Sequence, residues 1–514
     1  MASGKLTKYS GKLLPILPDD GGIGKTTCKS KRICYNIMYS GLSIPCGRYK
    51  EVRYGLKKRS KFQQFLVGGQ SVGLSATRII ALTFAVIILL GALLLMLPVS
   101  SRNGVSCGFL PALFTATSTT CVTGLVLFDT WTQWSGFGQT VILCLIEIGG
   151  LGFMSAASLV VFVLRRKVGL KQRLIMAQAL SLNDMESVIK LEKWVIFGSL
   201  SVQLLGALIL ALRFLPEYGV KTAIIWGIFH SVSAFCNAGF DILGCIEPGA
   251  SVMAFSGDAV VCLTLMALIV FGGLGFFVWE ELARVRSYKK LSVYSKLVLI
   301  TSFVLILGGG ILFCLLEWNN PGTLGSMTTG EKILNGFFQS VSTRTAGFAS
   351  FDQGQLTDAG KALTVMLMFV GGSSGSTAGG MKTVTLVVLL LFMAAKARGK
   401  GNINVFHRTI PQDQVLNAMT IFSIMVGLSL FGSIFICTTS PVSFVDALYE
   451  AVSALATVGL TAGVTTQLSI PAQILIIVYM YFGRVGVLTI SLGFLMGDKA
   501  EERFRYAQTN LLIG

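Results

Sequence analysis

Charge is the scarcest property of this 514-residue sequence, because only 13% of its residues are Asp, Glu, Lys or Arg. A soluble chain carries about a quarter charged residues. The deficit argues against a cytosolic enzyme and against a disordered or fibrous protein. Acidic residues are the rarer sign, at 24 against 42 Lys and Arg, for a formal net charge of +18. The basic residues lie between long apolar runs, which favours a membrane topology and no nucleic-acid partner.

Residues that build metal centres and disulfide frameworks are also few. The only histidines are His230 and His407, and the 11 cysteines include no Cys-x-x-Cys pair. We therefore expect no zinc site, no disulfide framework, no catalytic centre and no covalently bound cofactor. The first 60 residues are polar and basic and contain no apolar segment typical of a cleavable signal peptide.

Long apolar runs are what the sequence has in abundance, with 53% hydrophobic residues. A helix needs about 20 apolar residues to cross a bilayer. Eight runs meet this length: 77–98, 136–164, 192–215, 255–283, 295–317, 359–395, 414–437 and 471–496. Four half-apolar stretches between them are too short to cross: 110–122, 222–236, 331–344 and 441–456. The pattern predicts an all-α membrane protein with eight transmembrane helices and four re-entrant pore loops.

Basic residues alternate from one loop to the next. Of the 42, 34 lie in the segments 1–78, 165–193, 284–296, 396–408 and 497–514. Solvated linkers alone would not produce this alternation. Because loops rich in Lys and Arg stay in the cytoplasm, we predict a multi-pass plasma-membrane protein with both termini cytoplasmic.

Each half-apolar stretch ends in a glycine turn of similar sequence. The four turns are Thr120–Leu125, Phe235–Phe240, Thr343–Phe348 and Leu455–Leu460, and their glycines are 115, 108 and 112 residues apart. One such turn is typical of a tight loop outside the membrane, but four at this spacing indicate a fourfold repeat. The predicted segments are a basic arm (1–75), four repeats (76–165, 190–284, 295–396 and 412–496) and a tail (497–514).

The turns suit cation coordination. Irregular backbone at membrane depth is tolerated only where it is buried in protein or lines water. Glycine permits torsions that place successive carbonyls on one side, and four such turns form rings of oxygens that replace a cation's hydration shell. The short helices direct their negative C-terminal ends to the same place. No turn contains a carboxylate, which favours a large monovalent cation over a divalent one.

These four turns resemble the filter turns of the Trk/Ktr/HKT potassium transporter superfamily, in which one chain holds four M1–P–M2 units around one ion pore. The resemblance covers roughly residues 75–496 and is strongest to KtrB-type membrane subunits of bacterial Ktr uptake systems. It implies potassium as the transported ion. Sodium-favouring members often have Ser at the first filter glycine, so Gly124 supports potassium. The implied filter comprises Val122, Thr123, Gly124, Asn237, Ala238, Gly239, Thr345, Ala346, Gly347, Thr457, Val458 and Gly459.

The resemblance also implies partners. KtrB-type subunits form homodimers and work with a cytosolic, KtrA-like RCK regulatory subunit that binds nucleotides. The basic loops 165–193, 284–296 and 396–408 are the natural docking surface for such a subunit.

The apolar run 359–395 is interrupted by residues 371–382, with five glycines in ten residues. Each glycine costs roughly 1 kcal/mol against Ala inside a helix. A glycine-rich packing seam is the alternative, although such seams usually keep the helix intact. We favour a flexible intramembrane loop beneath the filter, held by few contacts, which the resemblance implies is a gate. The predicted gate comprises Gly371, Gly372, Ser373, Ser374, Gly375, Ser376, Thr377, Gly379, Gly380, Lys382 and Arg484.

Intramembrane and near-filter charges are few. An Arg within a span is costly and faces a cavity or a partner. Arg484 is therefore either a structural Arg or, as the resemblance implies, a positive charge in the pore below the filter. Asp129, Asp241 and Asp352 follow three filter glycines and would concentrate cations at the external mouth, unless they are ordinary loop acids. Glu147 lies within a span and receives no role.

The stretch Asp20–Thr27 looks like a deviant phosphate-binding loop, but the strand before it and the helix after it are missing. We interpret the arm as a flexible basic segment near anionic lipid. An ATP-driven pump is excluded by the lack of a nucleotide domain. A proton- or sodium-coupled carrier of another small cation stays open, although it would need more ionisable residues at mid-membrane than Glu147, Lys382 and Arg484.

Overall fold

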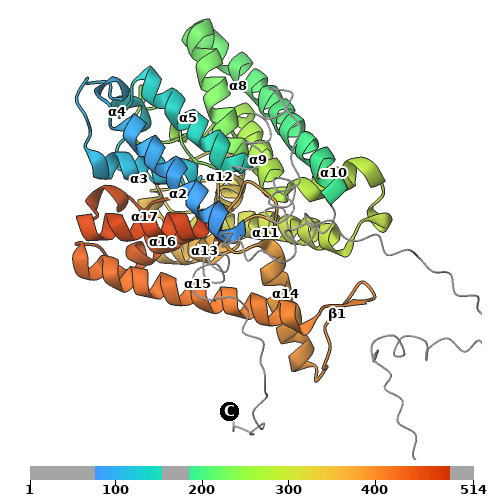
Figure 1. The fold of residues 1–514 in the computed structure, drawn as a ribbon. Coiled ribbons are helices and arrows are strands. Elements are labelled where there is room, and N and C mark those ends of the chain that lie inside the picture. The colour runs from blue at the N-terminus through green and yellow to red at the C-terminus, as the bar shows by residue number, and fades with distance from the viewer. Residues whose placement is uncertain (1–75, 153–184, 487–514) are drawn as a thin grey trace, which may run out of the picture. The chain divides into compact units, whose positions relative to one another are not determined.

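The computed structural model describes residues 76–152 and 185–486, and all structural statements below concern these residues. The predicted N-terminal arm, most of the basic loop 165–193 and the C-terminal tail lie outside them. Apart from its loops, the described part of the chain consists of helices and two short strands (Figure 1). Its strands form one two-stranded antiparallel hairpin of β1 (Asn404–Val405) and β2 (Arg408–Thr409).

Four times along the chain, one helix leads to a second helix that ends at a glycine turn, and further helix follows. The leading helices are α2 (Ala76–Leu95), the first part of α8 (Met185–Phe235), α11 (Val293–Glu317) and α15 (Gln412–Thr439). The helices that end at the turns, called pore helices below, are α3 (Phe109–Thr120), the last part of α8, α12 (Thr329–Ser342) and α16 (Phe444–Leu455).

The turns are followed by α5 (Gly136–Leu151), α9 (Ala259–Leu274) with α10 (Phe276–Val285), α13 (Asp358–Met368) with α14 (Thr383–Ala397), and α17 (Ile470–Val485). Short elements connect these helices: η1 (Pro98–Ser100), α4 (Thr130–Gln133), η2 (Met253–Phe255), η3 (Tyr288–Lys290), η4 (Gln353–Gln355) and η5 (Thr465–Gln467).

Two glycines bend the helical chain, one where the sequence predicted a boundary and one where it did not. The predicted stretches 192–215 and 222–236 lie on either side of Gly219 in α8, where φ is 76° and the chain kinks. The apolar run 255–283 was predicted to be one span, but it breaks at Gly275 and its halves, α9 and α10, meet at 92°. Gly275 has a φ of 89°, which glycine adopts without a Cβ clash. The amide of Phe276, freed by the break, donates to the carbonyl of Gly375 at 2.9 Å.

Three of the described helical stretches are long and apolar enough to cross a membrane: Trp194–Phe235, Val293–Glu317 and Gln412–Thr439. The bent pair α9 and α10 makes a fourth if it is counted as one span. Shorter apolar helices of 10–17 residues occupy Ile80–Leu95, Gly136–Leu151, Thr383–Ala397 and Ile470–Val485. The chain is therefore a helical membrane protein, while the arrangement of eight spans stays a prediction.

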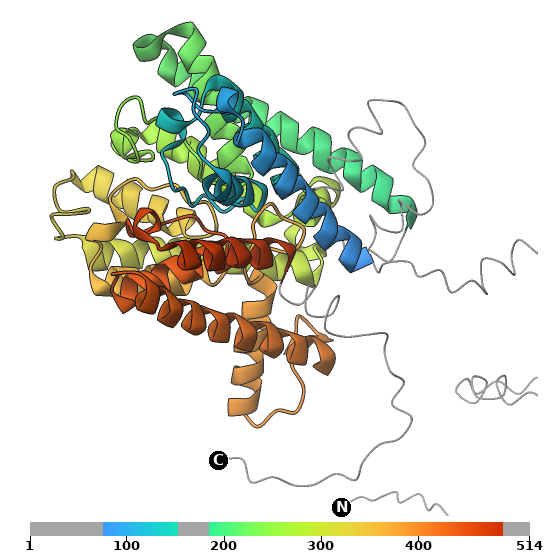
Figure 2. The same ribbon diagram turned by 60° about the vertical axis from the view of Figure 1, so that its left-hand side comes forward.

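The pore helices and their turns occupy the buried core. All residues of Phe114–Leu125, Ser233–Phe240, Phe338–Ser350 and Tyr449–Leu460 are buried. The outer helices pack around them: α2 and α15 both contact α17, and α15 and α17 run in a similar direction while α2 crosses at an angle (Figures 1 and 2). Helix α14 packs on α11 and α15 and leads to the β hairpin. A buried backbone turn must satisfy its polar groups within the protein, and this requirement shapes the site.

Candidate functional site

The four glycine turns share an unusual backbone. Val122, Asn237, Thr345 and Thr457 occupy equivalent positions two residues before each glycine, and all have left-handed φ values, of 55°, 57°, 66° and 53°. The glycines themselves, Gly124, Gly239, Gly347 and Gly459, have φ values of 98°, 69°, 80° and 92°. A left-handed residue other than glycine costs about 1–3 kcal/mol and persists only where the surroundings hold it. Four at equivalent positions indicate a shared function.

The turns meet one another in the order of the repeats. A Cβ on Gly124 would lie 2.6 Å from the carbonyl oxygen of Ala238 in the second turn. The same holds at 2.7 Å between Gly239 and Ala346, and at 2.6 Å between Gly347 and Val458. The ring closes because a Cβ on Gly459 would strike the carbonyl oxygen of Thr123. Each glycine therefore leaves the room in which the carbonyl of the next turn sits.

A serine near the end of each pore helix holds the turn. Its carbonyl accepts from the amide of the residue before the turn glycine, at 2.8–2.9 Å in all four repeats. Two of these serines also bind the glycine itself, since the amide of Gly124 donates to Ser118 Oγ at 3.1 Å and that of Gly459 to Ser453 Oγ at 3.0 Å. The four are Ser118, Ser233, Ser342 and Ser453. The sequence shows a Ser five or six residues before each glycine, but its pattern gave these serines no role.

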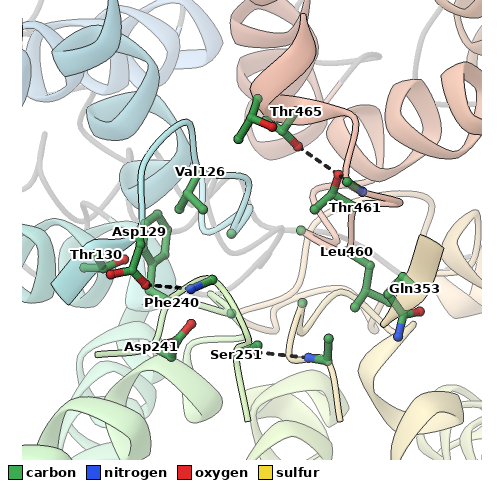
Figure 3. Close-up of a pocket in the computed structure, with 18 of the residues that line it drawn as sticks. Val126, Asp129, Thr130, Phe240, Asp241, Ser251, Gln353, Leu460, Thr461 and Thr465 are labelled. Carbon is green, nitrogen blue, oxygen red and sulfur yellow. Dashed lines mark hydrogen bonds between the residues drawn. The ribbon is translucent and has the colours of Figure 1, made fainter. Parts of the chain in front are cut away.

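One face of the ring lines a pocket of about 260 Å³ (Figure 3), and the glycines of all four turns are among its lining residues. The three predicted acids, Asp129, Asp241 and Asp352, line it as well. Each is oriented by a backbone amide: Asp129 accepts from Thr132 and Gly249, Asp241 from Leu243, and Asp352 from Gly354. Burial raises the pKa of the Asp241 carboxyl to about 7, and the neighbouring Asp129 adds to this.

The fourth repeat has no acid at the pocket surface, and instead a carboxylate lies behind it. Glu450 on α16 is fully buried and accepts from the hydroxyls of Thr461, at 2.8 Å, and Thr465. Thr461 and Thr465 both line the pocket and bond to each other at 3.0 Å (Figure 3). Glu450 thus holds the loop after the fourth turn. It was missed because an acid on an amphipathic helix usually faces solvent.

The glycine-rich segment 371–382 forms an irregular loop between α13 and α14, as predicted, but it is far from loosely held. Its two ends are joined by the Gly371 amide, which donates to the Met381 carbonyl at 2.9 Å. Its middle binds the break between α9 and α10: the amides of Ser373 and Thr377 donate to Gly273 and Gly272 at 3.0 and 3.2 Å. The expectation of few contacts was wrong, because backbone freed from a helix within the membrane must bond to protein.

The loop lies against the face of the ring opposite the pocket. A Cβ on Gly379 would strike Thr457, one on Gly380 would lie 2.9 Å from the Ala456 carbonyl, and one on Gly371 would lie 3.3 Å from Thr345 Cγ2. Thr377 reaches the second turn, with its hydroxyl 3.1 Å from the Phe235 carbonyl. The ring is thus enclosed between the pocket and the loop.

Arg484 joins the loop to the first repeat. From α17 its guanidinium donates to the carbonyl of Thr377 in the loop, and to the carbonyls of Gly149 and Gly150 on α5. These are carbonyl partners rather than carboxylates, so the side chain keeps its full positive charge beside the loop. Lys382 differs, because its ammonium folds back onto the loop's own carbonyls at Ala378, 2.7 Å, and Gly379, 3.5 Å.

Glu147, to which the sequence assigned no role, lies against the second turn. From α5 it accepts from Gln203 at 3.0 Å and from the thiol of Cys236, a residue of that turn, at 3.4 Å. His230 is buried in α8 and His407 lies in the hairpin turn. Within 76–152 and 185–486, no group of three or more His, Cys, Asp or Glu side chains is placed to hold a metal ion.

Comparisons with known proteins agree on one family. Residues 74–503 match TrkH, a family described as cation transport protein. The chain is 41% identical over 446 residues to the potassium/sodium uptake protein NtpJ of Enterococcus hirae, covering 86% of this chain and 98% of that protein. It is 38% identical to the Ktr system potassium uptake protein B of Bacillus subtilis, covering 83% and 94%. The crystal structure of the potassium transporter TrkH from Vibrio parahaemolyticus matches with a TM-score of 0.64 at 19% identity, covering 87% and 86%. That last match shows a shared fold.

Proposed function

The chain belongs to the TrkH family of cation transport proteins, and we propose that it takes up potassium across the plasma membrane through the ring of four glycine turns. The two relatives described above are named as uptake proteins, and both names include potassium. The proposed filter consists of the carbonyls of the two residues before each glycine, from Val122 and Thr123 in the first turn to Thr457 and Val458 in the fourth.

The observation that supports this proposal best is that the four turns contact one another in a closed ring. Each filter glycine leaves space for a carbonyl oxygen of the next turn, and the glycine of the fourth turn leaves space for a carbonyl oxygen of the first turn. A ring of neutral oxygens without a carboxylate favours a weakly hydrated monovalent cation, because the ion exchanges water for dipoles of similar strength. Asp129, Asp241 and Asp352 in the adjoining pocket raise the local cation concentration.

In this proposal the loop 371–382 closes the inner side of the ring. Its contacts with the second, third and fourth turns support this assignment. Arg484 holds the loop to α5 and places a positive charge beside the path. Opening requires the loop to exchange these bonds for others.

The proposed docking surface for a regulatory subunit is formed by two basic segments of the chain. The basic segments 284–296 and 396–408 contain no acidic residue, and they meet where the Lys296 ammonium lies 5.6 Å from the Phe406 ring centre and 5.8 Å from that of Tyr288. We propose that this joint surface docks a cytosolic, nucleotide-binding RCK subunit of the KtrA type. The proposal includes a homodimer of this chain, eight spans and cytoplasmic termini.

Potassium-dependent growth of a bacterial strain that lacks its own uptake systems tests the function, with and without a co-expressed RCK subunit. We expect growth at low potassium with the wild-type chain. Gly459→Ala is the matched loss-of-function variant, because its Cβ would strike the Thr123 carbonyl. Equal growth with this variant and with the wild type would exclude the ring as the path.

A second candidate is uptake of sodium together with potassium. It is favoured by one observation, the name potassium/sodium uptake protein of the 41% identical relative. Potassium uptake measured at several external sodium concentrations separates the two, since only a coupled or shared path makes potassium flux depend on sodium.

A further inference from the structure

One side chain breaks the fourfold pattern on the inner face of the ring. The equivalent left-handed positions carry Val122, Asn237, Thr345 and Thr457. The hydroxyls of Thr345 and Thr457 are buried without a hydrogen-bond partner. Asn237, 1% exposed, is the one that carries an amide, and both ends of this amide are bonded.

The amide of Asn237 connects the loop to a neighbouring turn. Its Oδ1 accepts from the hydroxyl of Thr377 in the loop at 3.1 Å. Its Nδ2 donates to the carbonyl of Arg344, the second residue of the third turn, at 3.3 Å. The two ends cannot be exchanged, because the Arg344 carbonyl can only accept and therefore requires the amide nitrogen.

Thr377 is committed to the second turn whichever acceptor it uses. Thr377 Oγ1 has one proton to donate, and two acceptors, Asn237 Oδ1 and the Phe235 carbonyl oxygen, each lie 3.1 Å from it. Both acceptors belong to the end of the second pore helix or to its turn. Gly272 on α9 makes the approach possible, since a Cβ there would lie 2.7 Å from Asn237 Oδ1 and 2.8 Å from Thr377 Oγ1. The Thr377 amide also donates to the Gly272 carbonyl at 3.2 Å.

We propose that Asn237 is a positioning residue that makes the cation preference of the ring depend on the position of the loop. Withdrawal of the loop breaks the bond from Thr377 and removes one of the two anchors of the Asn237 amide. The amide then holds the Arg344 carbonyl less firmly, so the third turn and its carbonyls relax. This inference rests on the proposed function of the ring and the loop.

The test removes the Thr377 hydroxyl in the loop and measures the cation preference of the ring. Thr377→Val removes the hydroxyl at nearly constant volume, and Thr377→Ser keeps it. Thr420→Val is the matched control, because it is the same substitution on the exposed side of α15, where the Thr420 hydroxyl bonds within its own helix, to the Leu416 carbonyl at 2.9 Å. Potassium and sodium fluxes are measured in liposomes with the full chain. The stabilisation of the purified chain by each ion in thermal unfolding gives apparent affinities that do not depend on transport.

One hydrogen bond shifts such an equilibrium by roughly two- to tenfold. We expect Thr377→Val to lower the potassium-to-sodium affinity ratio by about this factor, Thr377→Ser to restore it, and Thr420→Val to leave it at the wild-type value. If Thr377→Val does not purify as a folded protein, Thr377→Ala removes the same hydroxyl with less bulk.

Two outcomes overturn the coupling: a wild-type ratio in the folded Thr377→Val or Thr377→Ala variant, or an equal change in Thr420→Val. Both are distinct from failure of the proposed function, which shows as a wild-type chain that moves no more potassium than protein-free liposomes.

Discussion

The substitution Gly124→Ser tests the proposed filter most directly. Gly124 has a φ of 98°, where an L-residue is strained by about 1–3 kcal/mol. Its new Cβ would also lie 2.6 Å from the Ala238 carbonyl oxygen, which must then move by several tenths of an ångström. If this energy is released by loosening the ring, potassium preference over sodium falls by roughly 5- to 150-fold, since 1.4 kcal/mol is a factor of ten.

The assay is the potassium-to-sodium flux ratio of the purified chain in liposomes, beside a control with the same strain and no clash. Gly104→Ser is that control, because Gly104 has a φ of 67° and a Cβ there would meet no atom within 4 Å. We expect Gly104→Ser to lower stability and to leave the ratio unchanged. A folded Gly124→Ser protein with the wild-type ratio, or an equal change in Gly104→Ser, would refute the assignment of residue 124 to the filter.

Three further perturbations address the loop and the pocket. Arg484→Ala removes the donor that binds Thr377, Gly149 and Gly150, so potassium flux in liposomes should rise or become independent of the RCK subunit; wild-type flux and regulation in a folded variant would contradict this. Deleting Gly372–Gly379 should raise flux per folded molecule, whereas a packing seam would lose surface protein instead, and quantitative blotting beside flux distinguishes the two. Burial raises the pKa of Asp241 to about 7, so below that pH the carboxyl is neutral and the apparent potassium affinity should fall, whereas above it the affinity should level off. This change in affinity should extend over roughly one pH unit on either side of the Asp241 pKa. Asp241→Asn should abolish it, and an unchanged pH profile of the affinity in this variant would show that Asp241 does not act on the ion.

Local chemistry explains which parts of the site were readable from the sequence. The four turns could be found because a left-handed backbone demands glycine at Gly124, Gly239, Gly347 and Gly459, and that demand leaves a repeated signature. The interruption at 371–382 was readable for the same reason, since five glycines do not continue a helix.

Features that depend on distant partners were not readable. The break at Gly275 lies in a continuous apolar run, and what stabilises it is the Gly375 carbonyl, 100 residues away in sequence. The dense bonding of the loop depends likewise on Gly272 and Gly273 of α9. Glu450 has an unremarkable sequence context, and only the fold brings Thr461 and Thr465 to it. Pairings of this kind follow from three-dimensional packing, which hydrophobic periodicity does not encode.

The closing contact of the ring has a consequence for biosynthesis. The ring is completed only when Gly459 meets Thr123, and the bond from Arg484 to Gly149 joins residues that lie 335 positions apart in the chain. Contacts of such sequence separation form late, because the entropy of closing the intervening chain must be overcome first. A nascent chain with three repeats therefore has an incomplete ring. If the ring is the ion path, as we propose, that path does not exist before the last repeat is in place.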